Sequence, residues 1–426
     1  MDIQPSDSDR RQTRRLAATA VALAFFFYLL SRGVGESYSV FLLPLGRELG
    51  WSRSALTGVF SLYLAVSGIT AAIMGMLFDR FGPRFVYSLG LGSLGGGWFL
   101  AGFIEQVWQL YACLGILGGA GVTALGMVSG ASLIGRWHHK RLTTAMAIAY
   151  TGSGCGLLAL VPLCQFILDN LGWRYCFHLV GGGVLAICAA IQLLPWRALK
   201  AGHPAHPSKV RGQHGSPAAW TLARALRVPE FWYMAQVFFF TAVGMYIVLV
   251  QVVPFLVERG FSSMESASAF GLQGMLSVFG IVSAGWMVDR LGHRGVATLT
   301  FVGTGLGIVA LLALAYWKAG WLVTAYVLAF GLGQGGRGPI VSSLCARRFA
   351  GAGQATIQGA LFSGAWVGSA VGALCAGVLH DLTGGYVASF VVAIIAVLLG
   401  GIPFWLPHGL GSPSSPHARD TPETRR

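Results

Sequence analysis

The sequence predicts an all-α membrane protein in which twelve spanning helices form two pseudo-symmetric six-helix bundles. Of its 426 residues, 55% are hydrophobic and only 10% are charged, whereas soluble domains carry about 25% charged residues. Apolar segments of roughly 20 residues recur along the chain, and helices of that length cross a bilayer with their backbone groups paired. A charged turn that contains glycine also occurs twice, which indicates two related halves in one chain.

Short polar or glycine-containing turns separate the predicted helices. The expected spans are 16–44, 54–78, 84–104, 108–134, 142–168, 173–196, 230–257, 265–288, 296–316, 320–346, 353–379 and 386–406. They define a tail (1–15), an N-terminal bundle (16–196), a cytoplasmic linker (197–229), a C-terminal bundle (230–406) and a second tail (407–426). The 61 glycines suit close helix packing in lipid.

The repeated turn reads GMLFDRFGPR from Gly75 to Arg84, and GWMVDRLGHR from Gly285 to Arg294, 210 residues later. The same spacing relates Gly50 to Gly260 and Ser52 to Ser262. We expect the charged residues and glycines of both turns to form a gate at the cytoplasmic face, which comprises Gly75, Asp79, Arg80, Gly82, Arg84, Gly285, Asp289, Arg290 and Arg294.

The net charge of +14 is unevenly distributed along the chain. Most of the 29 basic residues fall in the tails, the linker and the turns that would face one side of the membrane. By the positive-inside rule, this places both termini in the cytoplasm and argues against a nucleic-acid partner. We expect a multi-pass monomer in the lipid bilayer of a bacterial cytoplasmic (inner) membrane.

No motif in the sequence indicates a cofactor, a metal site or catalysis. All seven cysteines lie in or beside apolar segments, without a C-x-x-C pair or a neighbouring histidine cluster. The glycine-rich runs lack the Gly-Lys-Ser/Thr of an ATP-binding loop. An intramembrane enzyme would need a nucleophile with a base or a metal, and a receptor would need a sizeable signalling domain. Both classes are therefore disfavoured.

Three charged residues lie inside predicted spans: Arg32 and Glu36 in the first, and Arg337 in the tenth. A charge at the bilayer centre costs roughly 2.5–3.5 kcal/mol on insertion scales, so such residues usually face a cavity. A guanidinium stays protonated and holds a carboxylate by two parallel hydrogen bonds. We therefore predict that Arg337 and Arg32 bind an anionic substrate.

Other roles are open for these three residues. Arg32 and Glu36 are four positions apart on one helix face and could simply neutralise each other. Arg337 could instead bond Glu36 or backbone carbonyls. Glu36 is the one carboxylate well inside a span, so it is either a proton-coupling group or a permanent partner of Arg32. Tyr63 and Gln273 occupy matching positions in the two halves, and we predict that both contact substrate.

The repeated turns and the Gly-Trp-Arg before the sixth span resemble the major facilitator superfamily over about residues 16–406. Within it, the chain is similar to the monocarboxylate porter and oxalate–formate antiporter branch at Gly50–Arg53, Ser61–Leu64, Asp79–Arg84 and Asp381–Gly384. The resemblance implies that spans one, four, seven and ten line a central cavity, and that the arginines of the gate pair across halves when the outside is open. Carriers of this branch often keep a basic residue in span eight, whereas 268–288 contains no charge.

Together these observations predict a secondary carrier that moves a small organic anion, a mono- or dicarboxylate, by alternating access. Proton symport is the expected driving force, and antiport of anions is the second choice. The alternative is a major facilitator efflux pump for a drug or amphipathic metabolite, for which we expect an acidic centre and not a basic one.

Overall fold

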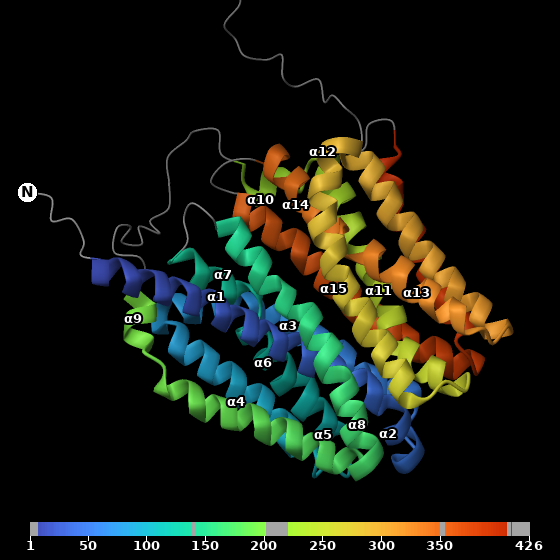
Figure 1. Cartoon of the computed structure of the whole chain (residues 1–426). Coiled ribbons are helices and arrows are strands. Elements are labelled where there is room, and N and C mark those ends of the chain that lie inside the picture. Colours follow the sequence, from blue (N-terminus) through green and yellow to red (C-terminus); the bar gives the residue numbers. More distant parts are fainter. Residues whose placement is uncertain (1–6, 138–141, 202–219, 350–353, 407–409, 411–426) are drawn as a thin grey trace, which may run out of the picture.

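The computed structural model describes residues 7–137, 142–201, 220–349, 354–406 and 410, which contain helices and no strand (Figure 1). The N-terminal half comprises α1 (Asp7–Glu36), η1 (Ser37–Phe41), α2 (Leu42–Leu49), α3 (Arg53–Phe81), α4 (Pro83–Ala101), α5 (Val107–Leu110), η2 (Tyr111–Gly118), α6 (Gly119–Leu125), α7 (Met127–Gly135), α8 (Leu142–Ala190) and η3 (Ile191–Leu193). Next come α9 (Trp196–Ala201) and α10 (Leu222–Ala225). The C-terminal half comprises α11 (Pro229–Glu258), α12 (Ser263–Tyr316), α13 (Gly320–Gly335), α14 (Arg337–Arg348), α15 (Gln354–Thr383), α16 (Val387–Gly401) and η4 (Ile402–Phe404).

These helices confirm the all-α membrane fold, because nine helical segments in the described ranges are long and apolar enough to cross a bilayer. One of the nine, Ile148–Leu193, covers two predicted spans and turns at Gly172. The predicted third and tenth spans coincide with α4 and with α13 plus α14. Twelve membrane crossings therefore remain a prediction that is compatible with the helices observed.

The two halves repeat the same backbone turns. All glycines with positive φ in the described chain fall into three matched pairs: Gly50 with Gly260 (φ 67° and 82°), Gly82 with Gly292 (86° and 70°), and Gly172 with Gly384 (81° and 65°). Glycine adopts this backbone region without the clash that a Cβ introduces. The matched glycines therefore reverse the chain between successive helices in both halves, as the sequence repeat indicated.

The fourth and tenth spans are each interrupted at a matched glycine. Gly126 leaves helical geometry (φ −81°, ψ −160°) between α6 and α7. Gly336, 210 residues later, separates α13 from α14. Both predicted spans are therefore divided in the structure. The chain leaves helical geometry at Gly126, whereas Gly336 keeps φ and ψ of −71° and −20°, close to helical values.

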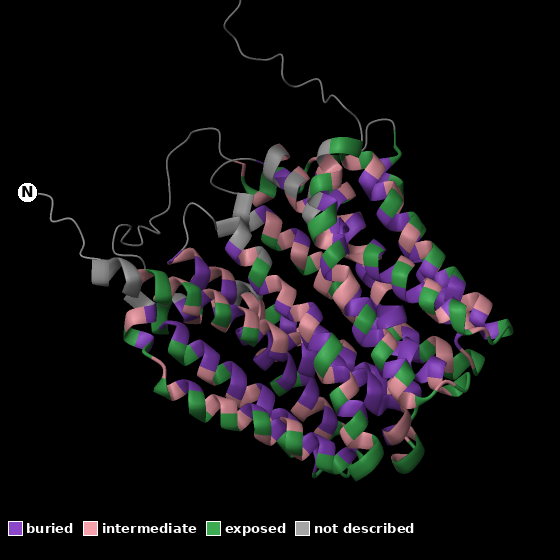
Figure 2. Ribbon diagram, in the orientation of Figure 1, coloured by how far each residue is buried: buried purple, intermediate pink, exposed green. Residues whose placement is uncertain are grey.

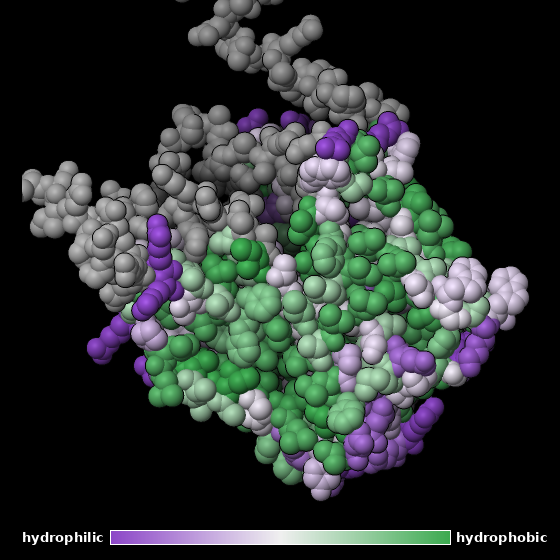
Figure 3. Space-filling view, in the orientation of Figure 1, coloured by the Kyte–Doolittle hydropathy of each residue, from purple (hydrophilic) through white to green (hydrophobic). Residues whose placement is uncertain are grey.

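The halves lie side by side, and α3 packs against α15 while α8 packs against α12 (Figure 1). Buried residues lie on the inward helix faces, whereas exposed residues cover the outside (Figure 2). Many exposed side chains are large and apolar, such as Ile69, Phe166 and Trp286. The face shown in Figure 3 carries a broad hydrophobic zone between more hydrophilic ends, as expected for a surface in contact with lipid.

Two ends of the molecule can be distinguished. We call the end that carries α9 and α10 the linker end, and the end that carries α2 and the start of α3 the Arg53 end (Figure 1). At the linker end the surface between the halves is hollowed (Figure 3). α1 begins at Asp7, inside the predicted tail, and α10 falls in the predicted linker. Residues 202–219, most of the linker, and nearly all of the tail 407–426 lie outside the described structure.

Candidate functional site

Arg32 and Glu36 form an ion pair where α1 faces the other half. They are one helical turn apart, which places both side chains on the same face of α1. Arg32 Nη1 lies 2.8 Å from Glu36 Oε1. The Arg32 side chain is 28% exposed, whereas that of Glu36 is 2% exposed. The pair therefore presents a partly accessible cation in front of a buried carboxylate.

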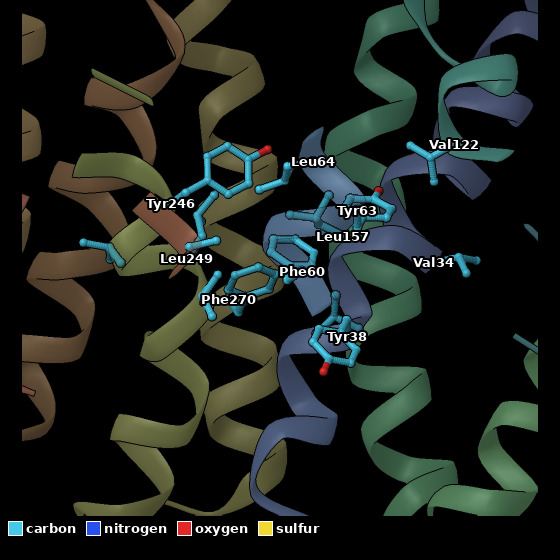
Figure 4. Close-up of a cluster of buried hydrophobic side chains, with 14 of the residues drawn as sticks. Val34, Tyr38, Phe60, Tyr63, Leu64, Val122, Leu157, Tyr246, Leu249 and Phe270 are labelled. Carbon is cyan, nitrogen blue, oxygen red and sulfur yellow. The ribbon is translucent and has the colours of Figure 1, made fainter. Parts of the chain in front are cut away.

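Tyr246, on α11 of the C-terminal half, contacts both members of this pair. Its hydroxyl oxygen lies 3.5 Å from Arg32 Nη1 and 3.5 Å from Glu36 Oε1. The tyrosine is buried, and its ring centroid lies 6.1 Å from that of Phe60 on α3. Figure 4 shows Tyr246 and Leu249 facing Phe60 and Leu64 across the interface between the halves. The ion pair is thus shared between the halves through a single hydroxyl.

Tyr63 lies beside this cluster, in an aromatic stack with Phe60 and Tyr38. The Phe60 centroid is 5.1 Å from that of Tyr63 and 5.9 Å from that of Tyr38. The Tyr63 hydroxyl is buried with no hydrogen-bond partner among the described residues, and a Cβ at Gly35 would collide with it. The cavity between these side chains has a volume of about 10 Å³. One water molecule fits such a space, but an organic anion does not.

Arg337 lies away from this cluster, against α12. Its guanidinium donates to Thr304 Oγ1 and lies 4.7 Å from the centroid of the Phe301 ring. The residue is 3% exposed, and within the described structure its Nε and Nη1 atoms have no hydrogen-bond partner. The structure therefore does not bring Arg337 together with Arg32. Its predicted contact with substrate remains a prediction, and in this conformation the guanidinium faces Thr304 and Phe301.

Tyr63 and Gln273 also have different surroundings, although their positions in the two halves match. Gln273 is fully buried, and its Oε1 accepts a hydrogen bond of 2.6 Å from Gln334 Nε2. Gln334 belongs to α13, so the Gln273 amide faces the interior of the C-terminal half. The predicted role of Gln273 in binding substrate remains a prediction without a contact to the Arg32–Glu36 pair.

The arginines of the predicted gate make contacts only within their own halves across the described residues. Arg84 Nε donates to Gln192 Oε1 at 2.9 Å, and Arg294 lies 4.2 Å from the centroid of the Trp405 ring. Arg80 and Arg290 lie over the rings of Phe81 and Trp286. Gly82 provides the matched turn described above, and Gly75 lies in α3. The side chains of Asp79 and Asp289, and residue Gly285, lie outside the part described in atomic detail.

At the Arg53 end, charged residues join the two halves directly. Arg53, at the start of α3, donates from Nη2 to Glu258 Oε1 and to the Tyr386 hydroxyl, both at 3.0 Å. The carboxylate of Asp381, on α15, accepts from the backbone N–H groups of Arg53 and Ser54 at 3.1 and 2.8 Å. A carboxylate at this place satisfies backbone donors that have no partner within the helix, and it is favoured by the helix dipole. These contacts close the Arg53 end.

The sequence did not indicate that Arg53, Glu258 or Asp381 joins the two halves. The available signal was the match of Gly50–Arg53 and Asp381–Gly384 to the carrier branch, but it did not indicate that the two segments meet. Among the described residues, no group of three histidine, cysteine or acidic side chains is placed to hold a metal ion.

Comparison with known proteins places this geometry in a family. The major facilitator superfamily model matches residues 21–362. Monocarboxylate transporter 13 of Rattus norvegicus is 28% identical over 91% of this chain and 88% of that protein, and the uncharacterized MFS-type transporter YcxA of Bacillus subtilis (strain 168) is 24% identical over 92% and 95%.

Solved structures share the fold. A bacterial homologue of the human lysosomal transporter Spinster, in an inward-facing and unoccupied conformation, superposes with a TM-score of 0.71 at 17% identity, covering 91% of this chain and 96% of that one. A mutant of the nucleoside transporter NupG superposes with a TM-score of 0.69 at 12% identity, covering 90% and 97%. The chain is therefore a multi-pass membrane protein that belongs to the major facilitator superfamily.

Proposed function

We propose that this protein is a secondary carrier that moves a small organic anion, specifically a monocarboxylate, together with a proton. The observation that supports this proposal most directly is the Arg32–Glu36 pair at the interface between the halves, with its guanidinium partly accessible. Relatives named as monocarboxylate transporters agree with this substrate class. Arg337 is engaged elsewhere, so a single guanidinium at the site favours one carboxylate over two.

The proposed cycle exchanges the partners of Arg32. A proton from water binds the Glu36 carboxylate, and the substrate carboxylate takes the place of Glu36 at the Arg32 guanidinium. The site then holds one added proton and one added anion, so its net charge does not change. On the other side of the membrane the substrate leaves, Glu36 loses the proton, and the ion pair forms again. The Arg32–Glu36 pair thus serves as the resting state of the carrier.

Alternating access would open the two ends in turn. In this conformation Arg53, Glu258 and Asp381 join the halves at one end, while at the other the gate arginines contact only their own halves among the residues that the structure describes. Contacts of this kind bias a two-state equilibrium by their differential strength. We propose that the linker end, with both termini, faces the cytoplasm of a bacterial cell, so that the present conformation opens inward.

Uptake by reconstituted liposomes tests the proposal. The panel contains formate, pyruvate and lactate as monocarboxylates and malonate and succinate as dicarboxylates, each with and without an inside-alkaline pH gradient. Removing Arg32 alone would leave the Glu36 carboxylate, which is 2% exposed, without its cation. Such a loss is strongly destabilising, by about 3–5 kcal/mol, so the informative variant at Arg32 is the double change Arg32→Gln with Glu36→Gln. The control is Arg174→Gln with Glu48→Gln, an exposed pair of similar length (2.6 Å).

We expect the wild type and the control to take up a monocarboxylate faster with the gradient, and the Arg32/Glu36 double variant to fold but not to transport. Undiminished uptake by that variant would remove the pair from the mechanism. Uptake of dicarboxylates alone would contradict the proposed substrate class.

A further inference from the structure

Tyr246 and Glu36 occupy the same position in the two halves. They are 210 residues apart, the spacing that relates the repeated turns, and their side chains meet. One half therefore contributes a carboxylate at this position and the other contributes a hydroxyl. A hydroxyl can accept a hydrogen bond from a guanidinium and donate one to a carboxylate at the same time. Tyr246 is thus placed to respond to the charge of the pair from the half that does not contain it.

Both contacts of the Tyr246 hydroxyl are weak in this conformation. At 3.5 Å both are long: an N–H donor such as Arg32 Nη1 usually lies about 2.7–3.2 Å from its acceptor, and a hydroxyl donor about 2.5–3.0 Å. Glu36 accepts mainly from Arg32 at 2.8 Å. The strength of the bond between Tyr246 and Glu36 therefore depends on whether Glu36 keeps Arg32 as its partner.

We propose that the Tyr246 hydroxyl is a positioning group that keeps the halves from moving when Arg32 holds substrate but Glu36 has not gained a proton. This inference rests on the proposed function. In that state the Glu36 carboxylate is buried and has lost its cation. The Tyr246 hydroxyl can then donate a charge-assisted hydrogen bond, which is shorter and stronger than a neutral one. That bond joins α1 to α11 across the interface.

Protonation of Glu36 removes the negative charge and weakens this bond, so that the halves can move with both proton and anion bound. Tyr246 would thereby prevent movement of the anion alone. Phe60 from the opposite half packs against the Tyr246 ring at a centroid distance of 6.1 Å and positions it.

The test measures the number of protons carried per anion in liposomes, with the panel monocarboxylate that the wild type takes up fastest. The variant is Tyr246→Phe, which keeps the ring and removes the hydroxyl. The matched control is Tyr326→Phe in the same half, because that hydroxyl is buried and has no partner within the described structure. A purely structural role would alter stability or rate, but not the proton-to-anion ratio.

We expect Tyr246→Phe to carry the anion without a proton about tenfold faster than the wild type does, as loss of one hydrogen bond to a charged group implies. The variant should also show a lower proton-to-anion ratio and a current driven by the membrane potential. A wild-type ratio without current would overturn the inference. If the variant does not fold, Phe60→Leu removes the ring that positions Tyr246; a wild-type ratio there would overturn it equally. Glu36→Gln separates the two proposals. If Glu36→Gln still couples anion transport to protons, the proposed function is refuted. If Glu36→Gln loses proton coupling but Tyr246→Phe keeps the wild-type proton-to-anion ratio, only the role of Tyr246 is refuted.

Discussion

Replacing Asp381 by Asn should open the Arg53 end. The Asp381 carboxylate accepts hydrogen bonds of 3.1 and 2.8 Å from the backbone N–H groups of Arg53 and Ser54, at the N-terminus of a helix in the other half. Asn keeps one oxygen acceptor but loses the negative charge. Hydrogen bonds to charged groups contribute about 1 kcal/mol more than neutral ones. The two together predict a loss of about 2 kcal/mol from the closed arrangement.

A change of about 2 kcal/mol shifts the ratio of closed to open molecules by about thirtyfold, since 1.4 kcal/mol corresponds to tenfold. Thr57→Cys reports this shift, because Thr57 is fully buried and lies where a Cβ on Gly377 of the other half would touch it. The assay is the rate at which a membrane-impermeant maleimide labels this cysteine in intact cells, above the background of the seven native cysteines. Labelling should be more than tenfold faster when Asp381→Asn is added.

The control is Asp169→Asn in the same Thr57→Cys background. Asp169 is also an acid, but it accepts from Gln165 of its own helix at 2.7 Å and does not join the halves. Its replacement should leave the labelling rate unchanged. Equal rates for the Asp381 and Asp169 variants would refute the reasoning that this carboxylate holds the two halves together.

Three further predictions concern stability and uptake. Gly35→Ala should lower stability by about 1–3 kcal/mol, the usual effect of an added methyl group without space, and Tyr63→Phe should restore most of the melting temperature because it removes the colliding hydroxyl. Gly292→Ala should lower the free energy of unfolding by about 1–2 kcal/mol, because φ is 70° there and a Cβ would strain the backbone although no neighbouring atom obstructs it. Gly305 lies in a helix and is equally unobstructed, so Gly305→Ala should not lower stability. Equal melting temperatures for the two variants would contradict the conformational argument. Arg337→Met distinguishes the sequence prediction for Arg337 from the proposed site, in which Arg32 is the single guanidinium that binds substrate. With that site, uptake and KM should stay within about twofold, because Arg337 faces Thr304 and Phe301 and an apolar side chain can replace a buried charge without loss of stability. A folded variant that no longer transports would show that Arg337 binds substrate, as the sequence predicts.

The sequence predicted those features that depend on local pattern or on the internal repeat. Gly82 and Gly292 were predicted as matched turns, and both have positive φ. Arg32 and Glu36 are one helical turn apart, so the spacing alone was enough to propose that they pair. Each of these features is contained in a short stretch of chain, which is why periodicity and spacing were sufficient.

Contacts between the halves could not be predicted in the same way. Tyr246 meets Glu36 across 210 residues, and Arg53 meets Glu258 across 205. Their proximity depends on how the two bundles pack, and no local pattern states it. For Arg337, a position inside the tenth span was predicted, but the direction of the side chain was not. Packing against α12 decides that direction.

Whether Glu36 exchanges Arg32 for a proton when substrate binds can be measured on the purified protein. Calorimetric titration with a monocarboxylate, in two buffers that differ in ionisation enthalpy, gives the number of protons taken up per anion bound. We expect one proton for the wild type and none for Glu36→Gln, with binding retained in both. Proton uptake that persists in Glu36→Gln, or anion binding by the wild type without any proton, would contradict the proposed exchange at Arg32.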